Sequence, residues 1–277
     1  MVDGSLNARF GLAGLQRAVG ELAVTIKQRG AASVLDGLRQ VGCLKARFPR
    51  SDGWRNVVTL NTSGGIAGGD ALTSRFAIGT GARATIASQA AERFYRALPG
   101  SDPSRVDTCI AVAAGGAAEW LPQETILFDR CCVRRRLQVE LAEDAWFLGV
   151  ESLVFGRAAT GEVVEQASLR DLIEVRRGGR LLLHDAIRLD GEVAATLRRP
   201  AIADGAGAVA TLVYVAPDAE AALDLVRAAS PQFGVSAWDG MLIARMLAAD
   251  GASLHAALIT ALQVLREGRP LPRVWLC

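Results

Sequence analysis

The sequence has few of the residues on which metalloenzymes and nucleophilic enzymes depend. Its 277 residues include only two histidines, His184 and His255, which cannot form a multi-histidine metal site within one chain. It contains no G-x-S-x-G motif, so it lacks the nucleophile elbow of the hydrolases. These absences exclude the catalytic motifs that a single sequence reveals most readily.

The five cysteines do not form the pattern of a disulfide-stabilised protein either. Their number is odd and no C-x-x-C pair occurs, which favours free thiols in a reducing compartment. Cys131 and Cys132 are adjacent, and neighbouring side chains on a strand point to opposite faces, so this pair is poorly placed to share a metal ion. We expect both to serve as small buried apolar side chains.

Long apolar runs and an excess of one charge are also missing. No apolar run approaches the roughly 18–20 residues that cross a bilayer as a helix, and residues 1–9 lack the features of a signal peptide. Lys and Arg total 31 against 29 Asp and Glu, without a basic block. We therefore expect a cytoplasmic chain that binds neither membrane nor nucleic acid. Hydrophobic residues still make up 51% of the sequence, which predicts a large core or apolar surfaces that partners cover.

Short alternating segments dominate about the first 200 residues. In residues 21–29, for example, Leu22, Val24 and Ile26 alternate with polar or small side chains, as in a half-buried strand. Other strand candidates follow at short spacing, namely residues 83–88, 106–112, 119–128, 133–141, 146–155, 169–175 and 181–189. Residues 90–97 are compatible with a helical turn, and Pro122 should place its strand at an edge or at a bulge.

The pattern changes after residue 209. Residues 209–215 form a continuous apolar run, which is typical of a strand buried on both faces. Pro217 and Asp218 should open one helix, and Ser253 should cap a second helix that Gly268 closes. Residues 241–248 fit a strand or a helix. The chain therefore predicts a mainly β fold with a C-terminal α+β portion that carries two helices.

We divide the chain accordingly into three parts. Residues 1–17 should be a loose leader, and residues 18–205 a β-rich domain. Residues 206–277 should be the α+β portion, packed on that domain in the same folding unit.

A glycine-rich loop is the most distinctive local feature. Its glycines are Gly64, Gly65, Gly68 and Gly69, and Asp70 follows directly. Gly64 and Gly69 have the spacing of a phosphate-binding P-loop, but Asp70 and Ala71 replace the lysine and the hydroxyl residue of that motif. A carboxylate there would repel a phosphate, and no helix pattern follows. We expect a hairpin loop that needs positive φ at several positions, which only glycine adopts without strain. This leaves the closing acid unexplained.

Two further acids lie within strand candidates. Glu151 interrupts the apolar segment 146–155, where a carboxylate is costly unless it is paired or ligated. Asp185 follows His184, and the two should face opposite sides of their strand. Carboxylate pairs alone do not diagnose acid–base catalysis in a chain with 29 acids.

Seven motifs together resemble the UreD (UreH) family of urease accessory proteins. They are G-G-I-A-G-G-D (64–70), F-Y-R (94–96), E-W-L-P-Q-E-T-I-L-F (119–128), F-L-G-V-E (147–151), G-R-A-A-T-G-E (156–162), R-L-L-L-H-D (180–185) and P-R-V-W (272–275). They follow the family's order over residues 18–277, and segment 119–128 is the most specific. The sequence departs from the family at residues 61–63, where many members have His-Pro-Pro, and at Glu92, where members often have Ser, Thr or Lys.

The resemblance implies a non-enzymatic chaperone of nitrogen compound metabolism. Such proteins assemble with UreF and the GTPase UreG, dock on apo-urease subunits and help to insert nickel, and a dimer within the accessory complex fits this role. The family's fold consists of helically stacked β-sheets with two helices and an internal passage lined by polar and acidic residues.

The family's acidic positions correspond to Asp70, Glu151 and Asp185, which we expect to bind nickel cations along that passage. Carboxylates hold nickel less tightly than histidine or thiolate clusters, so an ion can be handed on. No tightly bound cofactor is expected, only a transient nickel ion.

Other interpretations stay open. Asp70 would equally cap the glycine turn through backbone N–H groups, and Asp185 would form a salt bridge with one of the arginines. For the whole protein, the alternatives are a β-rich hydrolase that uses buried carboxylates and a structural adaptor without metal contact. The hydrolase would present an open cleft with two convergent acids.

Overall fold

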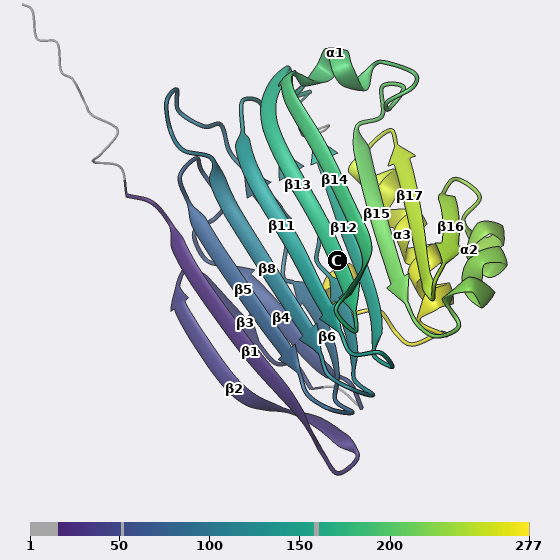
Figure 1. Ribbon diagram of the computed structural model, residues 1–277. Helices are drawn as coiled ribbons and strands as arrows, with labels where there is room; N and C mark the ends of the chain where they lie inside the picture. Colours follow the sequence, from purple (N-terminus) through teal and green to yellow (C-terminus); the bar gives the residue numbers. More distant parts are fainter. Residues whose placement is uncertain (1–15, 51–52, 158–160, 277) are drawn as a thin grey trace, which may run out of the picture.

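The computed structural model describes residues 16–50, 53–157 and 161–276, and its strands form two large sheets (Figure 1). The mainly β prediction is thus confirmed. The predicted leader lies almost entirely outside the described residues, and so do Cys277 and three residues of the motif 156–162.

One sheet has seven strands in the order β14-β13-β11-β8-β5-β1-β2. Its strands are β1 (Val19–Arg29), β2 (Ala32–Gly42), β5 (Ala71–Ile78), β8 (Ser104–Val112), β11 (Cys132–Leu141), β13 (Gln166–Arg177) and β14 (Arg180–Glu192). The five central strands are parallel, and antiparallel hairpins add β2 and β14 at the two edges.

The other sheet has ten strands, eight of them in the order β16-β17-β15-β12-β9-β6-β4-β3. These are β3 (Leu44–Arg47), β4 (Arg55–Asn61), β6 (Arg83–Ser88), β9 (Ala117–Leu121), β12 (Trp146–Phe155), β15 (Ala208–Val215), β16 (Gly234–Trp238) and β17 (Met241–Ala248). The short strands β7 (Glu92–Phe94) and β10 (Thr125–Leu127) pair with each other, and β10 also pairs with β12. Strands β4, β6, β9 and β12 are mutually parallel.

From β4 to β13 the chain passes repeatedly between the two sheets, so neighbours within one sheet are separated in sequence by a strand of the other. Parallel neighbours need a crossover connection, and here a strand of the opposite sheet supplies it. The outcome is the helically stacked arrangement that the family resemblance implies.

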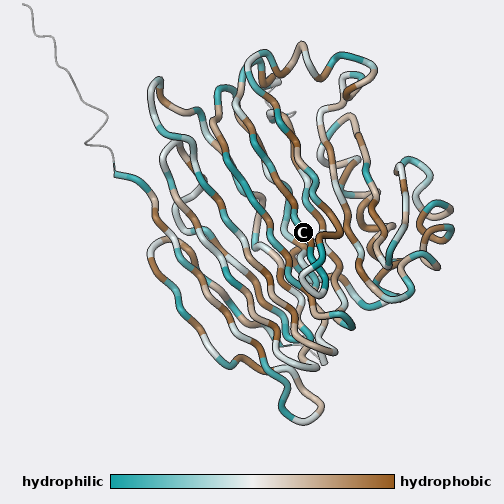
Figure 2. The backbone as a smooth tube through the Cα atoms, viewed as in Figure 1, coloured by the Kyte–Doolittle hydropathy of each residue, from teal (hydrophilic) through white to brown (hydrophobic). Residues whose placement is uncertain are grey.

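Two apolar layers hold this arrangement together. The first lies between the sheets, where Leu22, Val24 and Ile26 of β1 are buried as their alternation predicts. The second lies behind the ten-stranded sheet, which helix α3 (Gly251–Leu265) covers together with the shorter α2 (Leu223–Ala229). Strands β12 and β15 are therefore covered on both faces and read as continuous apolar runs, whereas the seven-stranded sheet alternates along its strands (Figure 2).

The glycine loop differs from the predicted hairpin. It connects β4 of the ten-stranded sheet to β5 of the seven-stranded sheet, so it turns a corner between layers. Residues 119–128 also form two strands rather than one, because β9 ends at Leu121 and Pro122 cannot donate to the ladder.

The structure corrects several local predictions and decides one that was open. Residues 92–94 of the expected helical turn form β7, and residues 241–248, which fitted a strand or a helix, form the strand β17. Helix α3 begins earlier than predicted, because the side chain of Asp250 caps it by accepting from the Ser253 N–H at 2.8 Å. The predicted helix after Pro217 is a 3-10 turn (Ala219–Ala222) that continues into α2. A short helix α1 (Val193–Leu197) was not anticipated.

Strands β15 to β17 extend the ten-stranded sheet from β12, so backbone hydrogen bonds join the strands of the C-terminal portion to the rest of the fold. The division into leader, β-rich domain and C-terminal portion stays a prediction. None of the helices in the described ranges combines the length and the apolar composition that a membrane-spanning helix requires.

Candidate functional site

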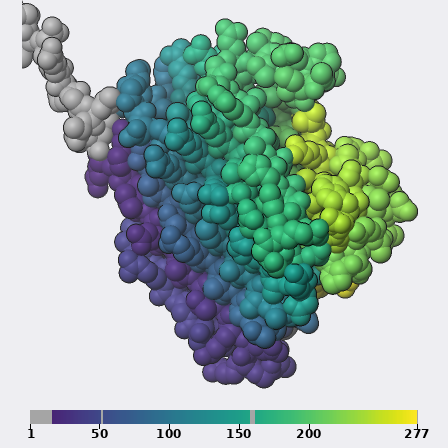
Figure 3. Space-filling view, viewed as in Figure 1, coloured from purple at the N-terminus to yellow at the C-terminus, as the bar shows by residue number. Residues whose placement is uncertain are grey.

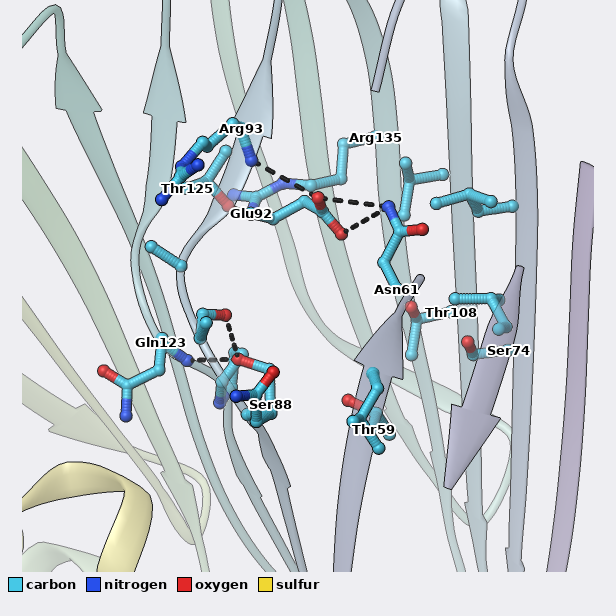
Figure 4. A pocket seen from close by; sticks show the side chains of 18 of the residues that line it. Thr59, Asn61, Ser74, Ser88, Glu92, Arg93, Thr108, Gln123, Thr125 and Arg135 are labelled. Atoms are coloured by element: carbon cyan, nitrogen blue, oxygen red, sulfur yellow. Dashed lines mark hydrogen bonds between the residues drawn. The ribbon is translucent and has the colours of Figure 1, made fainter. Parts of the chain in front are cut away.

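A cavity of about 290 Å³ lies between the sheets and is lined by residues of both (Figure 4). Polar side chains reach it from strands of both sheets, among them Thr59, Asn61, Ser74, Thr108, Arg135 and Glu151. Gly64 and Gly65 of the glycine loop form part of its wall. The cavity therefore brings polar and charged side chains together with apolar ones between the sheets.

Glu92 of β7 projects into this cavity (Figure 4). The amide of Asn61 donates to both of its carboxylate oxygens, at 3.2 and 3.1 Å. Burial raises the pKa of Glu92, and the Asn61 hydrogen bond and the charge of Arg93 oppose this only in part. Glu92 is one of the positions at which the sequence departs from the family.

A cluster of three buried charges closes one side of the cavity. Arg135 donates to both oxygens of Asp171, at 2.9 and 2.6 Å, and to Oε2 of Glu151 at 2.7 Å. It also donates to the Thr125 hydroxyl at 2.7 Å, and the indole of Trp120 donates to Oε1 of Glu151 at 2.7 Å. The three charged side chains are each at most 10% exposed. With all three groups ionised, the cluster carries one net negative charge.

The cluster sets the protonation of its members. Burial raises the pKa of Glu151 and Arg135 counteracts it, while the nearby Asp171 raises it further. Burial alone would lower the pKa of Arg135, but the two carboxylates more than compensate and raise it. Arg135 therefore stays charged, and it holds both acids in place.

Glu151 also lines a second cavity of about 10 Å³, which Asp171, Asp185 and Thr211 line as well. This volume is close to that of a single water molecule. Asp185, which lines only the smaller of the two cavities, forms an ion pair with Arg245 of β17. Three acids on β12, β13 and β14 thus follow one another through the interior, with arginines between and beside them.

Asp70 lies apart from these cavities. Its two oxygens accept from the backbone N–H groups of Ala18 and Ala67, each at 2.8 Å, and the side chain is buried. The carboxylate therefore ties the start of β1 to the glycine loop, as in the capping alternative. Of the three acids that the family resemblance places on the nickel path, the structure brings together Glu151 and Asp185 and not Asp70; their role on that path stays a prediction.

Glycine is required in the loop for steric reasons, most clearly at Gly65. Gly65 has φ of 141°, and a Cβ atom there would lie 2.3 Å from the ring of Tyr95. The Tyr95 hydroxyl donates to the Gly64 carbonyl oxygen at 2.9 Å. Strand β5 follows the loop, so no helix N-terminus is available for a phosphate.

The sequence analysis missed Arg135 and Asp171 of the charged cluster. It also missed Glu119, a buried acid outside that cluster. Arg135 and Asp171 interrupt the apolar faces of their strands, and this was the signal available for both. Glu119 is fully buried in β9, where it contacts Arg266, Arg269 and Thr85 on the side of the sheet that faces α3.

The cysteines are free thiols where the structure describes them. Cys131 is buried, as predicted, and its burial raises the pKa of the thiol to about 12. Cys132 is only half-buried, so the prediction is wrong for that residue. Within residues 16–50, 53–157 and 161–276, no group of three or more His, Cys, Asp or Glu side chains has the arrangement of a metal site.

The sequence of the chain matches a family model and individual proteins of known family. The family model described as UreD urease accessory protein matches residues 18–276. The urease accessory protein UreD of Dinoroseobacter shibae is 46% identical over 266 residues, which cover 94% of this chain and 93% of that protein. The UreD proteins of Azorhizobium caulinodans and Sinorhizobium medicae are each 44% identical and cover 94% of this chain, with 97% and 96% of their own lengths matched.

Proposed function

Since the chain belongs to the UreD family of urease accessory proteins, we propose that it helps to deliver nickel to apo-urease in a complex with UreF and UreG. Membership supports a role in urease maturation. In our proposal the chain is a cytoplasmic chaperone rather than a catalyst, and the GTPase partner supplies the nucleotide chemistry.

The series of interior carboxylates carries this proposal. Glu151, Asp171 and Asp185 line connected positions from the larger cavity to the smaller one. Oxygen ligands bind nickel weakly compared with histidine or thiolate clusters, which suits an ion in transit. The nickel ion is cargo here, and each acid would act as a brief resting point.

Arg135 and Arg245 explain how the acids stay buried when no ion is present. An unpaired buried carboxylate is costly, and a nearby guanidinium offsets that cost. Each arginine contacts the acids from one side, so a passing cation would compete with it for the carboxylate oxygens. The same contacts disfavour the hydrolase alternative, because acid–base chemistry needs carboxylates that are open to a substrate.

The test uses Glu151→Gln and Asp185→Asn, singly and together, in cells that co-express UreF, UreG and urease. We expect the accessory complex to co-purify normally and the nickel content of urease to fall. Glu174→Gln and Asp107→Asn, on the outer face of the seven-stranded sheet, are matched controls and should leave nickel content unchanged.

Two outcomes would overturn different parts of the proposal. Intact complexes with fully loaded urease in the double variant would remove these acids from the nickel path. If the unaltered chain forms no complex and does not change the nickel content of urease, the assignment of partners and delivery fails.

A further inference from the structure

Four arginines lie side by side on the outer face of the seven-stranded sheet, and we propose that this strip binds the acidic face of a partner protein's α-helix. The strip consists of Arg105 on β8, Arg134 on β11, Arg170 on β13 and Arg188 on β14. The proposal concerns the outer surface, so it does not depend on nickel passing through the interior.

The strand register places these residues in one line. Arg134 is the direct partner of Arg105 on one side and of Arg170 on the other, and Arg170 is the direct partner of Arg188. Directly paired residues point to the same face of a sheet. The neighbouring Val133 and Leu169 are buried in the core, so the four arginines project outward and are exposed. This face is turned toward the viewer in Figures 1 and 3, where β8, β11, β13 and β14 run side by side.

Such a row is unfavourable for the isolated sheet. Like charges on directly opposed residues destabilise a strand pair, and here three successive pairs are Arg–Arg. Arg188 has one distant partner, Asp190 at 3.8 Å. Throughout the described ranges, no ion pair joins Arg105, Arg134 or Arg170 to an acid.

The same face pairs opposite charges elsewhere. Arg136 forms an ion pair with Glu174 on the adjacent strand, and Arg39 does so with Glu21. The uncompensated row is therefore a local exception on a face where cross-strand charges otherwise match. An acidic partner that lies along the row would provide the missing compensation.

The spacing of the strip fits a helix. Neighbouring strands are about 4.8 Å apart, so three gaps span roughly 14 Å. Acidic residues at helix positions i, i+3, i+7 and i+10 lie on one face of a helix. They are displaced along the helix axis by about 4.5, 10.5 and 15 Å from the first, close to the distances of the second, third and fourth arginine from the first. Alternate residues of an extended segment are about 6.7 Å apart, so their register would be lost after one or two contacts.

The row next to the strip adds an apolar element. Leu172, half-buried, and Ala186 are paired on β13 and β14, two positions from Arg170 and Arg188. An amphipathic helix with acids along one edge of its face and small apolar residues beside them would contact both rows. The partner is thus a protein helix of mixed acidic and apolar character.

The test measures binding of a synthetic helical peptide with Glu at i, i+3, i+7 and i+10 to the full chain. Two reference peptides have the same composition with Glu spread over all faces, or with Gln in place of Glu. The strip variant replaces the four arginines by Gln (Arg105→Gln, Arg134→Gln, Arg170→Gln and Arg188→Gln). The control variant makes the same replacement at exposed arginines outside the strip (Arg29→Gln, Arg39→Gln, Arg83→Gln and Arg180→Gln), with an equal change in net charge.

We expect the one-faced peptide to bind best, and the strip variant to lose about tenfold or more in affinity while the control variant does not. The strip variant should also melt a few degrees higher than the unaltered chain, because the repulsion is relieved. The proposal is overturned if the unaltered chain does not bind the one-faced peptide, if the two Glu peptides bind equally, or if the strip variant binds as well as the control. It is also overturned if a single-stranded oligonucleotide or vesicles of phosphatidylserine bind the strip more tightly than the peptide.

Discussion

Arg266, which follows the last turn of α3, donates to both carboxylate oxygens of Glu119, a residue 147 positions earlier on β9. The two distances are 2.9 and 3.1 Å, and the side chains are 4% and 0% exposed. Arg269 contacts the same carboxylate at 2.8 Å, and the Thr85 hydroxyl donates to it at 2.6 Å. This cluster connects the end of the chain to the centre of the ten-stranded sheet, and it accounts for the first residue of the specific motif 119–128.

Removal of Glu119 should therefore be severe. Glu119→Ala leaves Arg266 buried without its partner, and loss of one member of a buried ion pair costs about 3–5 kcal/mol. We expect a decrease of that size in the free energy of unfolding, measured by urea denaturation.

The control is a double-mutant cycle. Replacement of both Glu119 and Arg266 by Met removes the two charges together, so the double variant should be more stable than the sum of the single changes predicts. An unfolding free energy for Glu119→Ala within about 0.5 kcal/mol of the unaltered chain would contradict the structural role of this cluster.

Asp70 should act mainly on stability. Asp70→Ala leaves the N–H groups of Ala18 and Ala67 without their acceptor, at about 1–3 kcal/mol for each group that stays buried. Asp70→Asn keeps one side-chain oxygen and should lose less. Thermal unfolding of both variants, together with the nickel content of co-expressed urease, checks this. If Asp70→Asn is as stable as the unaltered chain but lowers nickel content as Glu151→Gln does, Asp70 belongs to the nickel path.

The glycine loop offers a matched pair of substitutions. Gly65→Ala should destabilise the chain strongly, because φ of 141° is accessible almost only to glycine and the new Cβ would overlap the Tyr95 ring. Gly64→Ala places a Cβ in open space at φ of 80°, so it should cost only about 1–3 kcal/mol of backbone strain. Equal melting temperatures for the two variants would show that contact with Tyr95 does not determine the residue at position 65.

The sequence predicts the individual strands and helices better than it predicts how they are arranged in space. Alternation identified the buried face of β1, and the continuous apolar run identified β15 as a strand covered on both sides. Alternation shows which face of a strand is buried but not which strand lies beside it. The passage of the glycine loop from one sheet to the other was therefore missed, since a hairpin has the same local pattern.

The candidate site shows the same limit. Glu151 was identified because an acid within an apolar run needs a partner. Arg135 was not identified as that partner, although it interrupts the apolar face of its strand. Their contact depends on β11 and β12, which lie in different sheets. Asp171 joins them from β13 through the register with β11. The periodicity within a single segment does not show which strands lie side by side. The arginine strip was missed for the same reason, because it depends on the register of four strands.

Glu92 should make stability depend on pH. Its pKa is raised in the folded chain, mainly by burial, so the folded state holds the proton more tightly than the unfolded state does. Stability should therefore fall as pH rises from the ordinary pKa of a glutamate through the raised one. Glu92→Gln removes the charge but keeps an acceptor for Asn61. The variant should exceed the unaltered chain in unfolding free energy at pH 8, by roughly 1 kcal/mol or less, and the difference should shrink toward pH 4.5.

Glu174 supplies the control of opposite sign. The hydrogen bond from Arg136 holds the pKa of Glu174 below its usual value, and burial opposes this only in part. Its contribution to stability is present above the ordinary pKa and is lost as pH falls through the lowered one, so Glu174→Gln should be less stable than the unaltered chain at pH 8. Urea denaturation of the three proteins between pH 4.5 and pH 8 measures both effects. If Glu92→Gln and Glu174→Gln shift the unfolding free energy at pH 8 in the same direction, the buried position of Glu92 in the cavity does not control its ionisation.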